Sequence, residues 1–223
     1  MTKPAEDVEA VIQAAGQGTR LGLGPKAFLA LAGSTLLERA VATMLTIAPR
    51  VIVAVPATEL ARAQRLVDST ATTVIAGGMR RPDTLRALVR ASTAPWLVLH
   101  DVVHPFVTAE LSHGVLAEAR RVGAAAAALP IREFVYRTNG ELRAAPGEVV
   151  SMRKPVAFRR ADMLRGFATM DAANESNDLR DRSALEILAL AGQATAFVPA
   201  RSINFKLTTA DDFEIALHLA SRF

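Results

Sequence analysis

Short apolar runs alternate along the chain with longer segments in which apolar residues recur every three to four positions. The runs at residues 8–14, 51–55 and 96–99 are mostly apolar, as is typical of strands covered on both faces of a parallel sheet. The longer segments have the period of amphipathic helices. The pattern therefore predicts an α/β fold built from repeated β–α–β units, in which helices flank a mostly parallel sheet.

The predicted strands span residues 8–14, 51–55, 72–75, 96–99, 124–129 and 195–198, and the predicted helices span residues 35–48, 58–67, 83–91, 108–121, 161–167, 183–191 and 209–221. Thr35 followed by Glu38 is a capping-box pattern and marks the start of the first helix. The chain shows no internal repeat and no interdomain linker, so we expect a single domain over residues 1–223.

One segment departs from this alternation. In "IREFVYRTNGELRAAPGEVV", residues 131–150, apolar and polar residues alternate singly around Asn139-Gly140, which is a strong hairpin signal. An isolated hairpin is barely stable in water, so we expect this arm, at about residues 131–153, to pack against another surface. A second copy of the chain is the partner we expect, which predicts a homodimer through the arm.

The composition is that of a globular protein, with 51% hydrophobic residues, 22% charged residues and a net charge of +4. The basic residues are scattered, and no aromatic-rich basic stripe appears, so we expect no nucleic-acid partner. No apolar run approaches the ~20 residues of a membrane helix, and the start of the chain lacks a signal pattern, so we expect no membrane and a cytoplasmic protein. The absence of cysteine excludes disulfides and thiolate chemistry.

The loop after the first strand, "QAAGQGTRLGLGPKAF" at residues 13–28, carries four glycines with Arg20 and Lys26 among them. Glycine lets backbone amides approach an anion closely, and glycine loops between a strand and a helix commonly hold phosphate. The loop is not a Walker sequence, because Pro25 separates glycine from lysine, and its glycines lack the dinucleotide-binding spacing. Two cations among such amides predict a phosphate site.

Ligands of open α/β sheets bind outside the carboxyl ends of the strands. The loops at residues 15–26, 77–81 and 100–105 should therefore converge on this site. Only four of the 26 basic residues are lysines, namely Lys3, Lys26, Lys154 and Lys206. Because arginine is otherwise the usual cation of this chain, we interpret a lysine inside the folded part as a place that needs a compact ammonium.

The glycine loop has the pattern AAGxGxRxGxxxPK, which resembles that of nucleotidyltransferases joining a nucleoside triphosphate to a phosphorylated small molecule, with one residue fewer before Pro-Lys than in the commonest form. Three more segments follow in order: "AGGMRRPDTL" at 76–85, "LVLHDVVHPF" at 97–106 and "INFKLTTADDFEIA" at 203–216. Together, over residues 10–216, they are similar to the methylerythritol phosphate cytidylyltransferase family and its polyol-phosphate relatives. The resemblance implies a Rossmann-like, nucleotide-diphospho-sugar transferase type of fold with a protruding β-hairpin arm.

The resemblance implies a reaction in which CTP and an alcohol phosphate give a CDP-alcohol and pyrophosphate. The nucleophile is a phosphate oxygen, which is already ionised near neutral pH because its second pKa is about 6. The protein must therefore neutralise charge and align the reactants. The catalytic cations implied are Arg20, Lys26 and Lys206. Mg²⁺ or another divalent cation is expected on the phosphates, with Asp101 as a ligand or as a partner of an acceptor hydroxyl.

The resemblance also implies two sets of binding residues. Those for the nucleotide are Ala14, Ala15, Gly16, Gly18, Thr19, Gly77, Arg81 and Thr84. Those for the acceptor are Asp101, His104, Lys154 and Arg180.

The acceptor side departs from the family pattern. His104 stands where the family usually has arginine, and Lys154 stands roughly where it has threonine. Residues 133–134 read Glu-Phe where the family tends to show Asp-Thr, and residues 180–181 read Arg-Asp in place of Thr-Asp. The family's default acceptor is 2-C-methyl-D-erythritol 4-phosphate. The added cations favour a more anionic acceptor, such as a carboxylated compound, a phosphonate, or a sugar or polyol phosphate.

Three other interpretations stay open. A purely structural α/β domain leaves Arg20 and Lys26 unexplained, and a nucleotide-binding pseudoenzyme would be expected to have lost such cations. A nicotinamide-dependent oxidoreductase is disfavoured by the glycine spacing. His100 and His104 do not predict a transition-metal site, because no third ligand is evident.

Overall fold

The computed structural model describes residues 4–16, 18, 24–173 and 181–220. The strands are β1 (Val8–Gln13), β2 (Ala30–Leu31), β3 (Ser34–Thr35), β4 (Arg50–Val55), β5 (Thr72–Ala76), β6 (Trp96–Asp101), β7 (Ala124–Pro130), β8 (Val135–Tyr136), β9 (Leu142–Ala144), β10 (Val150–Arg159) and β11 (Ala196–Pro199). The α-helices are α1 (Leu36–Leu45), α2 (Leu60–Leu66), α3 (Arg81–Ala91), α4 (Ala109–Val122), α5 (Arg160–Ala172), α6 (Ala184–Leu190) and α7 (Ala210–Ala220). All the predicted strands and helices are present.

Several ends differ from the prediction. Helix α1 ends at Leu45, three residues before the predicted end, and α5 continues to Ala172 beyond the predicted range of 161–167. The start of α1 is as predicted, because Thr35 accepts from the backbone N–H of Glu38 while the Glu38 carboxylate accepts from the backbone N–H of Thr35. In the described part of the chain, no helix is both long and apolar enough to span a membrane.

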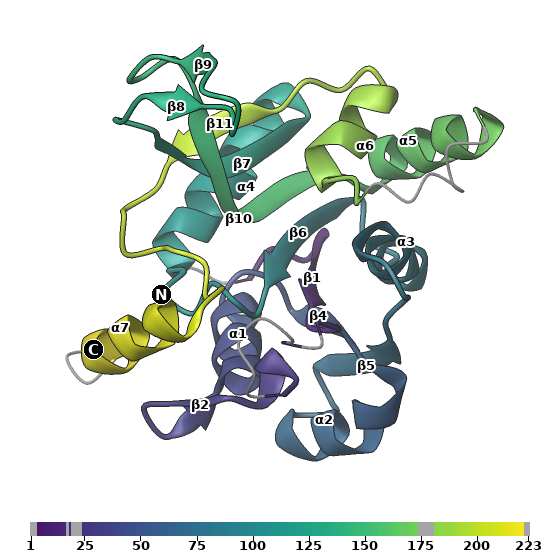
Figure 1. Cartoon of the computed structure of the whole chain (residues 1–223). Coiled ribbons are helices and arrows are strands. Elements are labelled where there is room, and N and C mark those ends of the chain that lie inside the picture. The colour runs from purple at the N-terminus through teal and green to yellow at the C-terminus, as the bar shows by residue number, and fades with distance from the viewer. Residues whose placement is uncertain (1–3, 17, 19–23, 174–180, 221–223) are drawn as a thin grey trace.

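The main sheet has seven strands in the order β11-β7-β10-β6-β1-β4-β5 (Figure 1). All neighbouring pairs are parallel except those of β10, which runs antiparallel to both β6 and β7. The mostly parallel sheet is thus confirmed, but β10 was not predicted. Arg153, Lys154 and Pro155 interrupt its apolar pattern, and its pairing with β7 shifts register between Met152 and Val156.

Helices cover both faces of this sheet, and alternate residues of each central strand point to opposite faces. In β1, Ala10 and Ile12 face the core shared with α1, α2, α4 and α7. Val11 faces the other core, which α3, α5 and α6 complete. Figure 1 shows α1 and α7 on one side of the sheet and α3, α5 and α6 on the other. Burial on both faces explains why these strands lack a clear polar alternation.

The strand order brings the three predicted site loops together. Chain order runs outward from β1 through β4 to β5, and then returns to β6 on the other side of β1. This reversal is the point where ligands of open α/β sheets bind. Gln13 at the end of β1 lies beside Asp101 at the end of β6 in the parallel register. The loops after β1, β5 and β6 therefore open at one edge.

The predicted hairpin is confirmed as β8 and β9, which form a separate two-stranded sheet away from the main one (Figure 1). Gly140 adopts a φ of +87° at the turn, and its N–H donates to the carbonyl of Arg137 at 2.9 Å. Phe134, Tyr136 and Leu142 on this arm are exposed. Apolar side chains on an exposed arm fit a protein partner, and the homodimer stays a prediction.

Gly166 is the position where we expect α5 to tolerate no side chain. A Cβ there would lie 2.0 Å from the carbonyl oxygen of Ile187 on α6, so Gly166→Ala should lower the free energy of unfolding by about 1–3 kcal/mol through overpacking. Gly114→Ala on α4 is the matched control, because nothing lies within 4 Å of its Cβ. This control should gain up to about 1 kcal/mol of helix propensity. Urea unfolding measures both, and equal effects would contradict the packing of α5 on α6.

Candidate functional site

The glycine loop after β1 folds back on itself. Gly18 has a φ of +70°, and a Cβ there would lie 2.0 Å from the Gly24 carbonyl oxygen and 3.2 Å from Cγ of Lys26. Only glycine permits this conformation and this approach. Ala14 continues the strand by donating to the Ala54 carbonyl at 2.8 Å. Two of the predicted site residues here, Thr19 and Arg20, lie outside the described residues.

The second loop, after β5, packs against the first, where Gly77 lies beside the side chain of Ala15. A Cβ on Gly77 would lie 2.5 Å from Cβ of Ala15, so the two predicted nucleotide-binding segments meet with no room for a side chain. Thr84, in the first turn of α3, is buried, and its hydroxyl accepts from the N–H of Gly78 at 3.0 Å. The Thr84 hydroxyl thus fixes the shape of this loop.

Gln13 and Arg81 join the same two loops from the side. The side-chain amide of Gln13 donates to the Arg81 carbonyl at 3.1 Å. The exposed guanidinium of Arg81 pairs with Asp181 at 3.5 Å. Gln13 was not singled out from the sequence, although its position at the end of the first strand could have indicated it. Arg180, the predicted neighbour of Asp181, lies outside the described residues.

Lys26 is tied to the C-terminal part of the chain. Its ammonium donates to the carbonyl of Leu207 at 2.8 Å and to that of Thr208 at 3.4 Å. Leu207 in turn donates through its N–H to the Val103 carbonyl at 2.8 Å, in the loop after β6. The structure therefore brings Lys26 beside the segment that holds Lys206. Lys26 thus bonds to the residue that directly follows Lys206, although about 180 positions separate the two lysines in the sequence.

The loop after β6 makes a tight turn around Asp101. The N–H of His104 donates to the Asp101 carbonyl at 3.0 Å, and the N–H of Val103 lies 3.4 Å from the Asp101 carboxylate. Val102 donates to the carbonyl of Gln13 at 3.3 Å. This turn brings the predicted acceptor residues Asp101 and His104 to the end of β1.

Burial and positive charge keep His104 neutral. Desolvation lowers the pKa of His104 well below its ordinary value, and the charges of Lys154, Lys206, Arg153 and Arg81 lower it further. Its Nδ1 is buried and has no hydrogen-bond partner among the described residues. His104 therefore offers hydrogen bonds here but no charge.

Lys154 lies almost completely buried beside this turn. Burial lowers its pKa to about 8, the carboxylate of Asp101 opposes this shift, and the charges of Arg81 and Lys206 add to it. These shifts show that Lys154, Asp101, Arg81 and Lys206 share one electrostatic environment. At neutral pH Lys154 still carries its charge.

His100 lies directly below this cluster and is fully buried. Desolvation and the neighbouring His104 lower its pKa to about 3, with Asp101 opposing and Lys154 adding to the shift. Neither ring nitrogen has a partner within the described part of the chain. Two buried neutral histidines therefore lie four residues apart at the end of β6.

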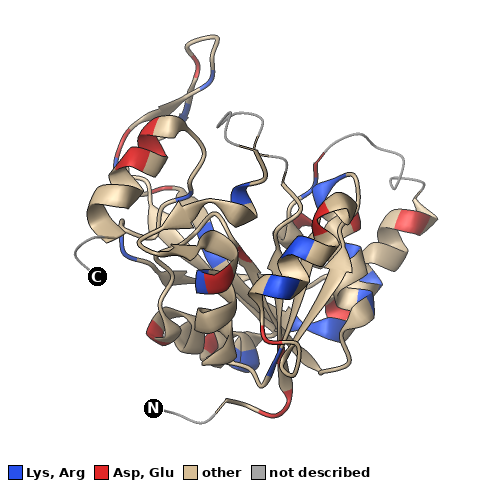
Figure 2. Cartoon of the chain, turned by 90° about the horizontal axis from the view of Figure 1, so that it is seen from below, with Lys and Arg blue, Asp and Glu red and all other residues tan. Residues whose placement is uncertain are grey.

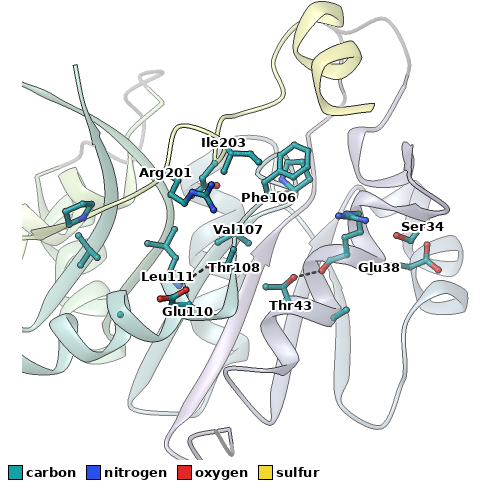
Figure 3. Close-up of a pocket in the computed structure, with 17 residues that line it drawn as sticks. Ser34, Glu38, Thr43, Phe106, Val107, Thr108, Glu110, Leu111, Arg201 and Ile203 are labelled. Atoms are coloured by element: carbon teal, nitrogen blue, oxygen red, sulfur yellow. Dashed lines mark hydrogen bonds between the residues drawn. The ribbon is translucent and has the colours of Figure 1, made fainter. Parts of the chain in front are cut away.

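A cavity of about 870 Å³ lies on the α1 and α4 side of the molecule, next to these residues (Figure 3). Phe106, Val107, Leu111 and Ile203 line it, and Figure 3 shows Glu38 and Thr43 of α1 on the opposite wall. None of the predicted site residues lines this cavity. The predicted site is thus the open edge formed by the three loops, and the cavity lies behind it.

A divalent cation fits this edge only together with a substrate. Among the described residues no cluster of three histidine or carboxylate side chains could hold a metal. Mg²⁺, however, is usually held by one or two carboxylates and by the phosphates of a substrate. Asp101, beside the end of β1, supplies one such carboxylate. The chemistry of the donor set therefore fits Mg²⁺ bound with a triphosphate.

Figure 2 shows lysine, arginine, aspartate and glutamate distributed over helices and loops rather than gathered on one side. The cations that converge are Arg81, Arg153, Lys154 and Lys206, whose charges all act on His104. Together with the glycine loop and the reversed strand β10, they define a nucleotidyltransferase of the α/β class.

Comparison with known proteins identifies the family. Residues 8–221 match the family described as IspD, 2-C-methyl-D-erythritol 4-phosphate cytidylyltransferase, and the chain belongs to this family. It is 35% identical over 210 residues to the 2-C-methyl-D-erythritol 4-phosphate cytidylyltransferase of Deinococcus radiodurans, covering 93% of this chain and 87% of that protein. It is 33% identical over 220 residues to that of Thermus thermophilus, covering 96% of this chain and 97% of that protein.

A comparison with solved structures supports the same family. The crystal structure of the Thermus thermophilus cytidylyltransferase superposes with a TM-score of 0.80 at 28% identity, covering 97% of this chain and all of that one. The predicted family and fold are therefore confirmed, and the chain is a CTP-dependent cytidylyltransferase. This result removes the structural, pseudoenzyme and oxidoreductase alternatives.

The buried histidines predict that stability falls in mild acid. In the unfolded chain a histidine binds a proton near pH 6.5, whereas His100 in the fold does so only near pH 3. The unfolded state therefore binds more protons in this window, and stability falls as pH drops below about 6.5, by up to about 1.4 kcal/mol per pH unit for each histidine. Urea unfolding at pH 7.5, 6.5 and 5.5 measures this slope.

His100→Leu removes one of these groups and should make the slope shallower. His218→Gln is the control, because His218 is exposed on α7. A slope that stays the same in His100→Leu, or that changes equally in His218→Gln, would contradict this assignment.

Proposed function

We propose that this cytidylyltransferase transfers CMP from CTP to the phosphate of a small polyol phosphate. The first acceptor to test is 2-C-methyl-D-erythritol 4-phosphate, the compound named in the family description. The observation that carries the proposal is the contact between the glycine-loop Lys26 and the segment of Lys206, at the strand ends where Asp101 also lies. A cation from the glycine loop is thus held against the segment that carries a second cation, where a triphosphate would be bound.

On the nucleotide side, the backbone of residues 14–18 and of Gly77 holds CTP. The close approach of Gly77 to Ala15 leaves no side chain at position 77, so a ligand can approach the backbone closely there. Arg81, at the start of α3, borders this surface. Thr84 contributes by holding the loop in shape, through its bond to Gly78.

In the transfer step an acceptor phosphate oxygen attacks the α-phosphorus of CTP, and the bond to the pyrophosphate oxygen breaks. Charge grows on the α-phosphate oxygens and on the leaving pyrophosphate, and Arg20, Lys26 and Lys206 neutralise it. No side chain has to remove a proton, because the attacking oxygen is ionised. A bound Mg²⁺, held by Asp101 and the phosphates, would neutralise further charge on the leaving group.

On the acceptor side, Asp101, His104, Lys154 and Arg180 form the second half of the site. His104 is neutral, so it recognises a hydroxyl or a phosphate oxygen by hydrogen bonding alone. The charge comes from Lys154 on β10, on the far side of Asp101 from the glycine loop. The positive charge that the family usually carries at position 104 has therefore moved to another strand.

This displaced charge favours a second candidate, an acceptor other than methylerythritol phosphate. A cation on β10 contacts a different part of the acceptor than a cation in the loop after β6. A second anionic group, as in a carboxylated compound, a phosphonate or a larger sugar phosphate, would be a suitable partner for Lys154.

Pyrophosphate release with CTP and Mg²⁺ separates the two candidates. The panel contains methylerythritol phosphate, ribitol phosphate, glycerol phosphate, sugar phosphates and small phosphonates. We expect release with methylerythritol phosphate. Release with another member of the panel alone would establish the second candidate, and binding of CTP without release in any case would contradict both.

Substitution of Lys154 tests the acceptor side. Lys154→Met should raise the acceptor KM about tenfold or more and leave the CTP KM within about twofold, because a charge-assisted bond to one substrate is lost.

In the parent enzyme the Lys154 ammonium is lost above pH 8, so kcat/KM for the acceptor should fall as pH rises beyond this value. Lys154→Arg keeps its charge and should remove the fall. An unchanged acceptor KM in Lys154→Met would contradict the assignment.

A further inference from the structure

The segment between β11 and α7 crosses the site and bonds to several of its parts. We define residues 200–209 as the strap. Figure 1 shows it as a long connection that descends from β11, passes the end of β6 and enters α7. Ala200 donates to the Ala128 carbonyl at 2.8 Å at one end of the strap, and Leu207 donates to the Val103 carbonyl at 2.8 Å near the other.

Near its middle the strap holds the backbone of Lys154. The side-chain amide of Asn204 donates to the Lys154 carbonyl at 2.7 Å, and both residues are buried. Lys154 lies where the pairing of β10 with β7 shifts register, between Met152 and Val156. Because the ladder is irregular there, the regular strand bonds do not fix this carbonyl. Asn204 supplies the missing donor.

At its C-terminal end the strap holds the side chain of Lys26. The Lys26 ammonium donates to the carbonyls of Leu207 and Thr208. Asp212 on α7 sets the direction of these carbonyls, because its Oδ2 accepts from the N–H of Thr208 at 2.7 Å and from that of Thr209 at 2.8 Å. Thr209 Oγ1 accepts in return from the N–H of Asp212 at 3.2 Å.

Asp212 is ionised in this arrangement. Burial raises its pKa, but the N–H groups of Thr209 and Thr208, the Thr209 hydroxyl and the nearby charge of Lys26 together hold the pKa below its usual value. Its carboxylate thus anchors the strap and lies close to the cation that the strap holds.

We propose that Asn204 and Asp212 are positioning residues for the two halves of the reaction, acting at separate points of one strap. Asn204 places Lys154 for the acceptor, and Asp212 places Lys26 for CTP through the carbonyls of Leu207 and Thr208. Neither residue touches a substrate. The inference rests on the proposed function for the roles of Lys26 and Lys154, but the placement of the lysines can be measured without either substrate.

The competing interpretation is that both residues act only on stability. Asp212 caps α7, and removal of a cap costs folding stability at any helix. Loss of activity alone would not separate the two interpretations. A signal from each individual lysine side chain does separate the two interpretations, and the chain has only four lysines.

The experiment uses the full-length enzyme labelled with ¹³C at lysine Cε, which gives four signals to assign with Lys→Arg variants. Asp212→Ala should shift the Lys26 signal and leave that of Lys154 in place, and Asn204→Ala should do the reverse. Asp212→Asn keeps an acceptor oxygen and should restore the Lys26 signal toward that of the parent. Asp211→Ala and Ser202→Ala are the matched controls, because Asp211 shares the first turn of α7 and Ser202 is an exposed strap residue.

Binding and kinetics complete the test. Asp212→Ala should weaken CTP binding about tenfold in calorimetry, and Asn204→Ala should leave CTP binding within about twofold while raising the acceptor KM about tenfold, since misplacing one group affects the substrate it contacts. Methylerythritol phosphate with CTP is the probe for the acceptor measurement. Urea unfolding of each variant shows that the protein tested is folded.

The outcomes separate the inference from the proposed function. If the lysine signals do not move, or if both variants move all of them alike, the strap does not position them and the inference is wrong. If the signals move selectively while CTP and acceptor binding stay unchanged, the positioning is correct and the proposed roles of Lys26 and Lys154 are wrong.

Discussion

The arrangement depends on packing several positive charges around the carboxylate of Asp101. Arg81, Lys154 and Lys206 reach the end of β6 from three different elements. The charges of Arg81 and Lys206 lower the pKa of Lys154, and all three charges lower the pKa of His104. Such a cluster resists assembly, because like charges that are partly removed from water repel strongly. The fold holds them together by large apolar cores on both faces of the sheet, so that the repulsion at one edge is overcome by burial elsewhere. A triphosphate then meets preorganised charge.

Most of the fold could be predicted from the sequence because burial on two faces leaves a clear mark. Strands such as residues 8–13 and 51–55 are apolar with no polar alternation, and the intervening segments have helical spacing. The antiparallel strand β10 could not be predicted in this way. Its middle carries Arg153, Lys154 and Pro155, which in a sequence resemble a loop, and only the tertiary pairing with β6 and β7 makes a strand of them. Lys154, which we propose to contact the acceptor, is thus one of the residues that interrupt the apolar pattern of this strand.

The parts of the candidate site that lie in one continuous stretch of sequence could be predicted. The glycine loop is a single stretch of chain, and the strand-end rule indicated that residues 77–81 and 100–105 would meet it. The resemblance to the family indicated the segment of Lys206 within the strap, but not the contacts that the strap makes. The contact between Lys26 and Leu207 uses a backbone carbonyl, which has no sequence signature, and Asn204 is one asparagine among other polar residues until its amide is seen to bond to Lys154. Sequence motifs therefore do not reveal the contacts that a side chain makes with the backbone of a distant segment.

In the proposed function, Lys154 supplies on the acceptor side the positive charge that the resemblance to the family places at position 104. A neutral imidazole in the loop after β6 and a buried ammonium on β10 keep the number of positive charges while moving one of them. Electrostatic stabilisation of the transferred phosphate by Arg20, Lys26 and Lys206 is left intact by such a move, because these cations lie on the nucleotide side. Recognition of the acceptor is altered by this move, because a charge-assisted hydrogen bond is directional and its donor lies on another strand. Under the proposed function, the chain therefore keeps the cations that CTP requires, and its departures from the family pattern concern the acceptor.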